Sequence, residues 1–213
     1  MIPTLLFCTG DAGAGKTTFI QERLLPDELF HNLRSATTRP PRKEYGEYEG
    51  NPYFFRDEDF FKNPKDFATY LFVNEQTWKP GDPKWLYGIP KSEVMDNLGK
   101  NLVYDVIQPR YVAQMIKWMD ENKLKSEYNI KIAWFLPFKD GVDIIGKRAN
   151  MPNDKIIREK NTCTAYDILD AGLEIDYTLC PRKNQYSQSL NNLISILYDD
   201  MMQKRPKLQP RTK

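Results

Sequence analysis

Apolar and polar residues follow two patterns along this chain, one typical of buried strands and the other of helices. Short apolar runs rich in β-branched and aromatic residues predict strands at 4–8, 102–107, 131–138 and 176–180. Stretches with helical spacing predict helices at 16–25, 111–121, 154–169 and 187–202. The order of strand followed by helix predicts an α/β fold, in which a parallel sheet is flanked by helices.

One segment departs from this pattern. Residues 34–97 are rich in Tyr, Phe, Pro and Gly and read as short strands and turns, with one helical stretch at DEDFF. We interpret 34–97 as an insertion into a single domain of residues 1–203, because 213 residues suffice for one buried core and do not demand two. The basic, proline-broken residues 204–213 predict a disordered tail.

Composition and charge argue against a nucleic-acid-binding, membrane-spanning or disulfide-bonded protein. The 31 Lys and Arg residues against 29 Asp and Glu leave a net charge of +2, so no global field favours a nucleic acid or an anionic membrane. No window approaches the roughly 18 apolar residues of a membrane span. Cys8, Cys163 and Cys180 are widely spaced and favour reduced thiols. We therefore expect a cytoplasmic protein, and we expect it to be a monomer or a homodimer. The single histidine, His31, has no partner pattern around it and is expected to be a surface residue.

The stretch GDAGAGKTT, residues 10–18, carries the most specific chemistry. It fits the pattern G-x-x-x-x-G-K-[ST], whose glycines let backbone N–H groups surround phosphate oxygens while Lys16 reaches the β and γ phosphates. The Thr17 hydroxyl can hold Mg²⁺, and the helix that starts at Lys16 turns its positive end to the anion. The expected ATP-binding residues are Gly10, Asp11, Ala12, Gly13, Ala14, Gly15, Lys16, Thr17 and Thr18.

A second phosphate site is predicted at residues 35–55, SATTRPPRKEYGEYEGNPYFF. Arg39 and Arg42 lie three positions apart, with hydroxyl residues before them and tyrosines after them, which suits a phosphate monoester dianion. This stretch resembles the monophosphate site of guanylate kinases, S-x-T-T-R-x-P-R followed by a glycine and Y-x-F. With the spacing of the P-loop, the resemblance covers most of residues 1–180.

The resemblance implies a P-loop NTPase core with an inserted monophosphate-binding subdomain and a lid at 139–158. It implies transfer of a phosphoryl group from ATP, with Mg²⁺, to a nucleoside monophosphate. Glu75 falls where the family reads the guanine edge, and Tyr87 matches the family's Y-G-[ST]. The implied acceptor-binding residues are Ser35, Arg39, Arg42, Tyr53, Glu75, Tyr87 and Asp105, although two extra residues separate Arg42 from Tyr53.

Two departures fall on residues that would read the base. Ile89 replaces the family's hydroxyl residue, and Ile107 replaces the second aspartate of D-x-D-x-Q-G, so that only Asp105 remains. An aliphatic pocket discriminates weakly among bases. GMP or dGMP is thus the leading acceptor, while another deoxynucleotide, a pyrimidine or a modified base fits these departures about as well. Gln76, Thr77 and Gln108 could replace the lost contacts.

The segment DGVDIIGKRANMPNDKIIREK resembles the family's lid, in which arginines close over the phosphates. Arg148 and Arg158 are its best matches and, with Lys16, the expected catalytic residues. Ile144 lies near the position of a missing lid arginine, for which Lys147 could substitute. Two other classes stay open: a non-catalytic guanylate kinase-like binding module, which the intact GAGKTT disfavours, and a kinase of the same fold acting on a sugar phosphate.

Overall fold

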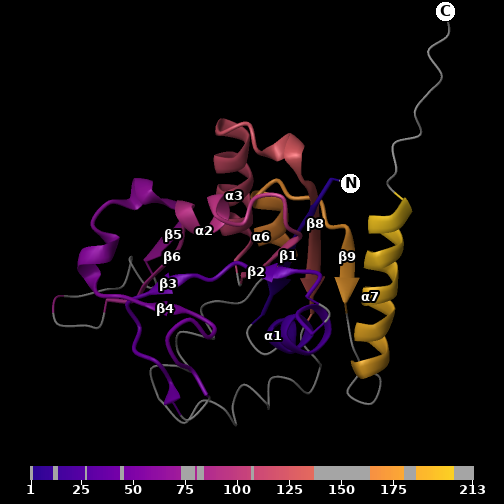
Figure 1. Cartoon of the computed structure of the whole chain (residues 1–213), viewed down its shortest axis with the longest axis horizontal. Helices are drawn as coiled ribbons and strands as arrows, with labels where there is room; N and C mark the ends of the chain where they lie inside the picture. The colour runs from indigo at the N-terminus through magenta and orange to yellow at the C-terminus, as the bar shows by residue number, and fades with distance from the viewer. Residues whose placement is uncertain are drawn as a thin grey trace, which may run out of the picture.

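Figure 1 shows the computed structural model of the chain, in which two sheets of different size lie side by side. The structure describes residues 2–11, 14–26, 28–43, 46–72, 80, 84–106, 108–136, 164–179 and 186–203. The larger sheet has the order β2-β7-β1-β8-β9, and its neighbouring strands are all parallel. Its strands are β1 (Thr4–Gly10), β2 (His31–Asn32), β7 (Leu102–Val106), β8 (Asn129–Phe135) and β9 (Tyr177–Leu179).

The main helices are α1 (Lys16–Phe19), α2 (Lys91–Met95), α3 (Pro109–Glu121), α6 (Ala165–Asp170) and α7 (Tyr186–Gln203). Helix α1 continues as a π-helical turn, η1 (Ile20–Leu24), and 3₁₀ turns occur at η3 (Glu58–Phe61), η4 (Pro64–Asp66) and η5 (Lys125–Glu127). With a mostly parallel sheet flanked by helices, the predicted α/β fold class is confirmed.

Strand β1 carries the core on both of its faces because its side chains alternate. Leu5 and Phe7 belong to one buried cluster, which includes Val112, Met115 and Met119 of α3. Leu6 and Cys8 belong to a second cluster on the opposite face, built with Phe19, Ile20 and Leu24 after the P-loop and with Leu190, Leu193 and Leu197 of α7. The sheet is therefore the middle layer of three, and β1 delivers the P-loop at its carboxyl end.

Gly10 ends β1 where only glycine fits. Its φ is 136°, and a Cβ atom there would lie 2.1 Å from the carbonyl oxygen of Phe135 in β8. A φ of this sign is costly for residues with a side chain. The close approach of β8 to the start of the P-loop thus depends on the absence of a side chain at this position.

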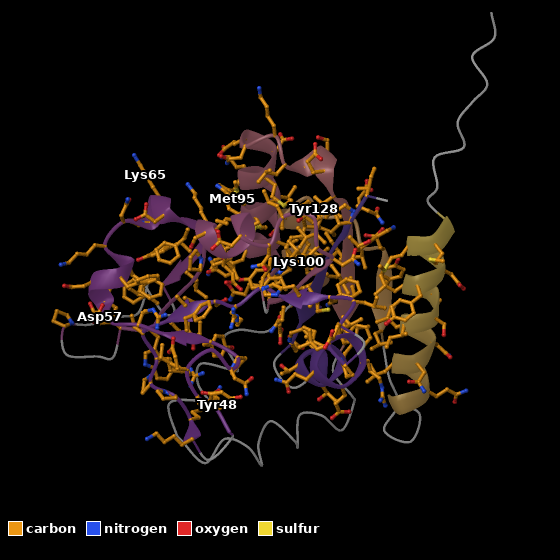
Figure 2. The ribbon with its side chains drawn as sticks, viewed as in Figure 1. Tyr48, Asp57, Lys65, Met95, Lys100 and Tyr128 are labelled. Carbon is orange, nitrogen blue, oxygen red and sulfur yellow. The ribbon has the colours of Figure 1, made fainter. Side chains whose placement is uncertain are left out.

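The smaller sheet is built from residues inside the predicted insertion, in the order β4-β3-β6-β5. Its strands are β3 (Ala36–Thr37), β4 (Phe54–Phe55), β5 (Phe67–Phe72) and β6 (Leu86–Pro90). Strands β3 and β4 pair in parallel, and the other pairs are antiparallel. In Figure 2, Asp57 and Lys65 lie at the outer side of this sheet, far from Tyr128 beside the larger one.

Glu93 of α2 links the two sheets. Its side chain is 9% exposed, and its Oε1 lies 3.3 Å from Nε2 of His31 in β2 and 3.4 Å from Nε of Arg34. His31, expected as a surface residue, lies on the edge strand with its side chain 27% exposed, and it contacts this carboxylate. The polar pair His31–Asn32 also gave no strand signal, although it forms the edge strand β2 beside β7.

The other predicted elements differ from the structure mainly at their ends, apart from the helix predicted at 154–169, of which the structure describes only residues 164–169 and places 165–169 in α6. The strand predicted at 131–138 begins at Asn129 and ends at Phe135, and the helix predicted at 16–25 changes to π-helical geometry at Ile20. None of the helices in the described part of the chain combines the length and apolar character that crossing a membrane requires.

Candidate active site

The P-loop lysine is positioned by the backbone around it. Gly15, with φ 92°, precedes α1 in the left-handed region, so the helix begins at Lys16. The Lys16 side chain is buried, and its Nζ donates to the carbonyl oxygens of Gly10 (2.9 Å) and Asp11 (2.8 Å). The ammonium group is thus folded over the loop whose N–H groups are suited to phosphate.

The Thr17 hydroxyl and the Asp105 carboxylate meet at the carboxyl ends of β1 and β7. Thr17 Oγ1 donates to Asp105 Oδ2 at 2.8 Å, and Lys16 Nζ lies 3.9 Å from Asp105 Oδ1. Asp105 comes to this place because β7 pairs with β1 in a register that sets it opposite Cys8. A hydroxyl and a carboxylate are oxygen ligands of the kind Mg²⁺ prefers, so these residues fit a nucleotide-bound Mg²⁺ ion.

Residues predicted for the donor and for the acceptor line one cavity. Thr17 and Asp105 form its donor side, while Ser35 and Tyr53 reach it from the segment of the smaller sheet. The remaining lining residues are Ile20, Gln21, Asn32, Leu33 and Pro52. Asp105, predicted as an acceptor-binding residue, therefore lies between the two groups of residues.

Arg39, Tyr53 and Tyr87 form a compact group beside this cavity. The Arg39 side chain is buried, and its Nε donates to the Tyr87 hydroxyl at 2.9 Å. The Arg39 guanidinium lies over the Tyr53 ring, 5.4 Å from its centroid, and the two tyrosine rings meet edge to face at 5.8 Å. Burial, and then the charges of Tyr87 and Asp105, raise the pKa of Tyr53, so its hydroxyl keeps its proton at neutral pH.

Glu47 joins Arg39 to Arg42 and was missed by the sequence reasoning. Burial alone would raise the pKa of Glu47, but hydrogen bonds from Arg39 and the backbone of Arg42 outweigh it and lower that pKa. Burial alone would lower the pKa of Arg39, but the interactions with Glu47 and Tyr87 outweigh it and raise that pKa. The available signal was an acidic residue five positions after Arg42, in a segment with two arginines to neutralise.

Ile89 lies next to two hydroxyl groups. Strands β5 and β6 pair Thr69 with Ile89, and the Ile89 backbone N–H donates to Thr69 Oγ1 at 3.2 Å. Thr69 Oγ1 in turn lies 3.3 Å from the hydroxyl of Tyr104, whose pKa is raised by burial. The Ile89 side chain is fully buried in the core cluster that packs on α3. Ile89 thus lies in a buried apolar cluster, with a neutral hydroxyl at its backbone N–H.

Several predicted site residues lie outside the described part of the chain. They are Ala12 and Gly13 of the P-loop, Glu75 with Gln76 and Thr77, Ile107, and the whole predicted lid at 139–158 with Ile144, Lys147, Arg148 and Arg158. Cys163, Cys180 and the tail at 204–213 lie outside it as well. Their assigned roles stay predictions.

Comparisons with known proteins point in one direction. No protein-family model matches the sequence. A guanylate kinase of Lawsonia intracellularis is 32% identical over 108 residues, which is 48% of this chain but only 46% of that protein. A guanylate kinase of Prochlorococcus marinus is 27% identical over 177 residues, 82% of this chain and 87% of that protein.

A solved structure gives the same result for the fold. The crystal structure of guanylate kinase from Anaplasma phagocytophilum superposes with a TM-score of 0.57 and covers 95% of this chain and 87% of its own, at 18% identity. At this identity the likeness concerns the fold alone.

Proposed function

Because this chain is a guanylate kinase-like P-loop kinase, we propose that it phosphorylates a nucleoside or deoxynucleoside monophosphate to the diphosphate with ATP. GMP or dGMP is the leading acceptor. The observation that carries this proposal is the shared cavity, in which Thr17 and Asp105 face Ser35 and Tyr53. Transfer between two nucleotides requires both phosphates to reach one place in line, and a single cavity between the two groups of residues meets that need.

The described residues divide the work between the two substrates. Lys16 and the P-loop N–H groups hold the donor phosphates, with Thr17 and Asp105 as the residues that would hold the metal ion. Bound Mg²⁺ supplies neutralisation of the charge that develops on the transferred group. Arg39, Arg42, Ser35, Tyr53 and Tyr87 hold and orient the acceptor phosphate. We assign Arg148 and Arg158 to closure over both phosphates, which would exclude water.

A second acceptor class is favoured by one specific feature of the site. Thr69 and Tyr104 put neutral hydroxyls beside Ile89, where no described carboxylate is within hydrogen-bonding reach of the Ile89 backbone. These hydroxyls are buried and already bonded to one another and to the Ile89 backbone, so the aliphatic residue at position 89 offers a base no polar contact, and such a site discriminates weakly among bases. The alternative acceptor is therefore a different deoxynucleotide, handled by the same phosphate chemistry.

The deciding experiment measures ADP release from Mg·ATP by the purified protein against a panel of ribo- and deoxynucleoside monophosphates, including modified pyrimidines and sugar phosphates. Preference for GMP or dGMP supports the leading acceptor. Preference for another base supports the alternative. Activity on sugar phosphates alone, or no activity on the whole panel, rejects the proposed function, and the latter result would favour a binding module.

A further inference from the structure

The Glu47 carboxylate accepts hydrogen bonds from both Arg39 and Arg42. Its Oε2 accepts from Arg39 Nη1 and from the backbone N–H of Arg42, both at 2.8 Å. Its Oε1 accepts from Arg39 Nη2 at 3.0 Å and from Arg42 Nε at 3.2 Å. The Glu47 side chain is 9% exposed, so these bonds are shielded from solvent. One carboxylate thus connects both arginines assigned to the acceptor phosphate.

The remaining bonds of Arg39 define which of its edges stays available. Its Nε donates to Tyr87, and Nη1 also donates to the carbonyl oxygen of Pro40 at 2.9 Å. Among the described residues, no acceptor binds the second hydrogen of Arg39 Nη2. This hydrogen lies on the edge of the guanidinium that also carries Nε, which donates to Tyr87. Because the Tyr87 oxygen accepts from Arg39, its own proton is left to donate to another group.

We propose that Glu47 is the positioning residue of the acceptor site, whose carboxylate holds the Arg39 and Arg42 guanidinium groups in one arrangement and so directs the open edge of Arg39 and the Tyr87 hydroxyl to the acceptor phosphate. The inference rests on the proposed function. Two cations close together repel one another and two long side chains are costly to order, and a shared carboxylate offsets both costs before the substrate binds.

Glu49 is a matched control on the same loop. Its Oε1 pairs with Arg56 Nη1 at 2.6 Å, and its Oε2 accepts from the Phe55 backbone, but its side chain is 55% exposed. Glu49 therefore makes an ion pair and a backbone contact like those of Glu47, without touching Arg39 or Arg42. Tyr48, between the two glutamates, shows the place of this loop in Figure 2.

The kinetic test compares Glu47→Gln and Glu49→Gln with the wild-type protein. We expect Glu47→Gln to raise the KM of the acceptor about tenfold or more, because charge-assisted bonds are lost from both arginines, while the KM of ATP stays within about twofold. Glu49→Gln should leave both constants unchanged. The proposal would be overturned if Glu47→Gln left the acceptor KM unchanged or changed the KM of both substrates equally. A lowered acceptor KM would also overturn it, because it would mean that the carboxylate competes with the acceptor phosphate.

A binding test separates this inference from the proposed function. Line broadening of inorganic phosphate in ³¹P NMR is measured in a Lys16→Ala background, which weakens the donor site. Adding Glu47→Gln should weaken phosphate binding about tenfold and adding Glu49→Gln should not. The role of Glu47 is rejected if all three proteins bind phosphate equally. It is also rejected if the Lys16→Ala protein, without a second substitution, binds no phosphate. The outcome does not depend on whether any nucleotide is phosphorylated.

Discussion

The Thr17 hydroxyl donates a 2.8 Å hydrogen bond to Asp105, a residue 88 positions away in the sequence. The bond joins the first turn of α1 to the end of β7, and its two oxygens are the described pair best suited to a metal ion next to Lys16.

Asp105→Asn should lower kcat about 10–100-fold and raise the Mg²⁺ concentration needed for half-maximal rate, because the carboxylate that orients the metal ligand is lost. The measurement is an Mg²⁺ titration at saturating ATP. Asp176→Asn is the control, since Asp176 pairs with Lys131 at 2.6 Å away from the P-loop. An unchanged Mg²⁺ dependence would show that Asp105 does not serve the metal.

Lys16→Ala should reduce kcat about a hundredfold or more, because charge on the moving phosphoryl group loses a positioned cation. Binding of the acceptor should persist, since the Lys16 ammonium is held by Gly10, Asp11 and Asp105 and touches none of the arginines or tyrosines assigned to the acceptor phosphate in the described hydrogen bonds and ion pairs. Single-turnover rates and calorimetric titration with the acceptor test the two halves of this prediction. Wild-type turnover in the variant would remove Lys16 from the donor site.

Arg39→Lys should raise the acceptor KM about 10–100-fold, because hydrogen bonds to a charged group contribute about 1.5–3 kcal/mol and the ammonium cannot replace a guanidinium fork. Arg56→Lys, which alters an exposed arginine over the Phe54 ring, is the matched control. Steady-state kinetics with the preferred acceptor give both constants. Equal behaviour of the two variants would mean that Arg39 is not part of the phosphate clamp.

Ile89→Thr should shift the ratio of kcat/KM for GMP over the other acceptors upward by about 2- to 10-fold, because it adds a hydroxyl beside Thr69. Ile89→Val isolates the loss of volume, which should cost about 0.5–1.5 kcal/mol of stability in this buried position. The ratio is measured on the nucleotide panel. The same ratio in both variants would show that residue 89 does not read the base.

Glu47 should make stability depend on pH. Its pKa is lowered in the folded protein, so the stabilisation is present above the ordinary value of about 4.5 and is lost as the pH falls through the lowered pKa. At pH 7, Glu47→Gln should therefore lower the free energy of unfolding by about 1–3 kcal/mol.

The difference from the wild-type protein should shrink below about pH 4.5, where the wild-type side chain becomes neutral as well. Urea unfolding at a series of pH values measures it. A difference that does not change with pH would mean that shape, and not the charge of Glu47, stabilises the loop. Glu49→Gln should show little difference at any pH, since Glu49 is exposed and solvent screens its pairing with the partly exposed Arg56.

Strands β1 and β7 of the larger sheet could be read from the sequence because nearly all of their residues are buried, on both faces. The apolar run of β1 and the loop after it are local patterns, and they predicted both the strand and the start of α1 at Lys16. Strand β2 could not be found this way, since two polar residues, His31 and Asn32, have no periodicity and pair only because β7 lies beside them.

The site was predictable where a motif fixes chemistry and unpredictable where packing decides it. The spacing of the arginine pair and of the lysine assigned them candidate phosphate contacts, and these roles stay predictions. The bond between Glu47 and Arg39 and the contact between Thr69 and Tyr104 depend on which side chains the fold brings together. The spacing of residues in the sequence does not predict such contacts. Ile89 was read as a departure in a pocket, and its complete burial against α3 adds a structural role that the sequence did not reveal.

The close approach of Gly10 to Phe135 affects how variants of this loop can be interpreted. A methyl group at position 10 would collide with a main-chain carbonyl of β8, which cannot move aside as a side chain could. An alanine allele at this position would therefore separate the two central strands and lose nucleotide affinity only secondarily. In a screen for loss of activity it would look like a defect in substrate binding, while its primary lesion would be in the architecture of the sheet.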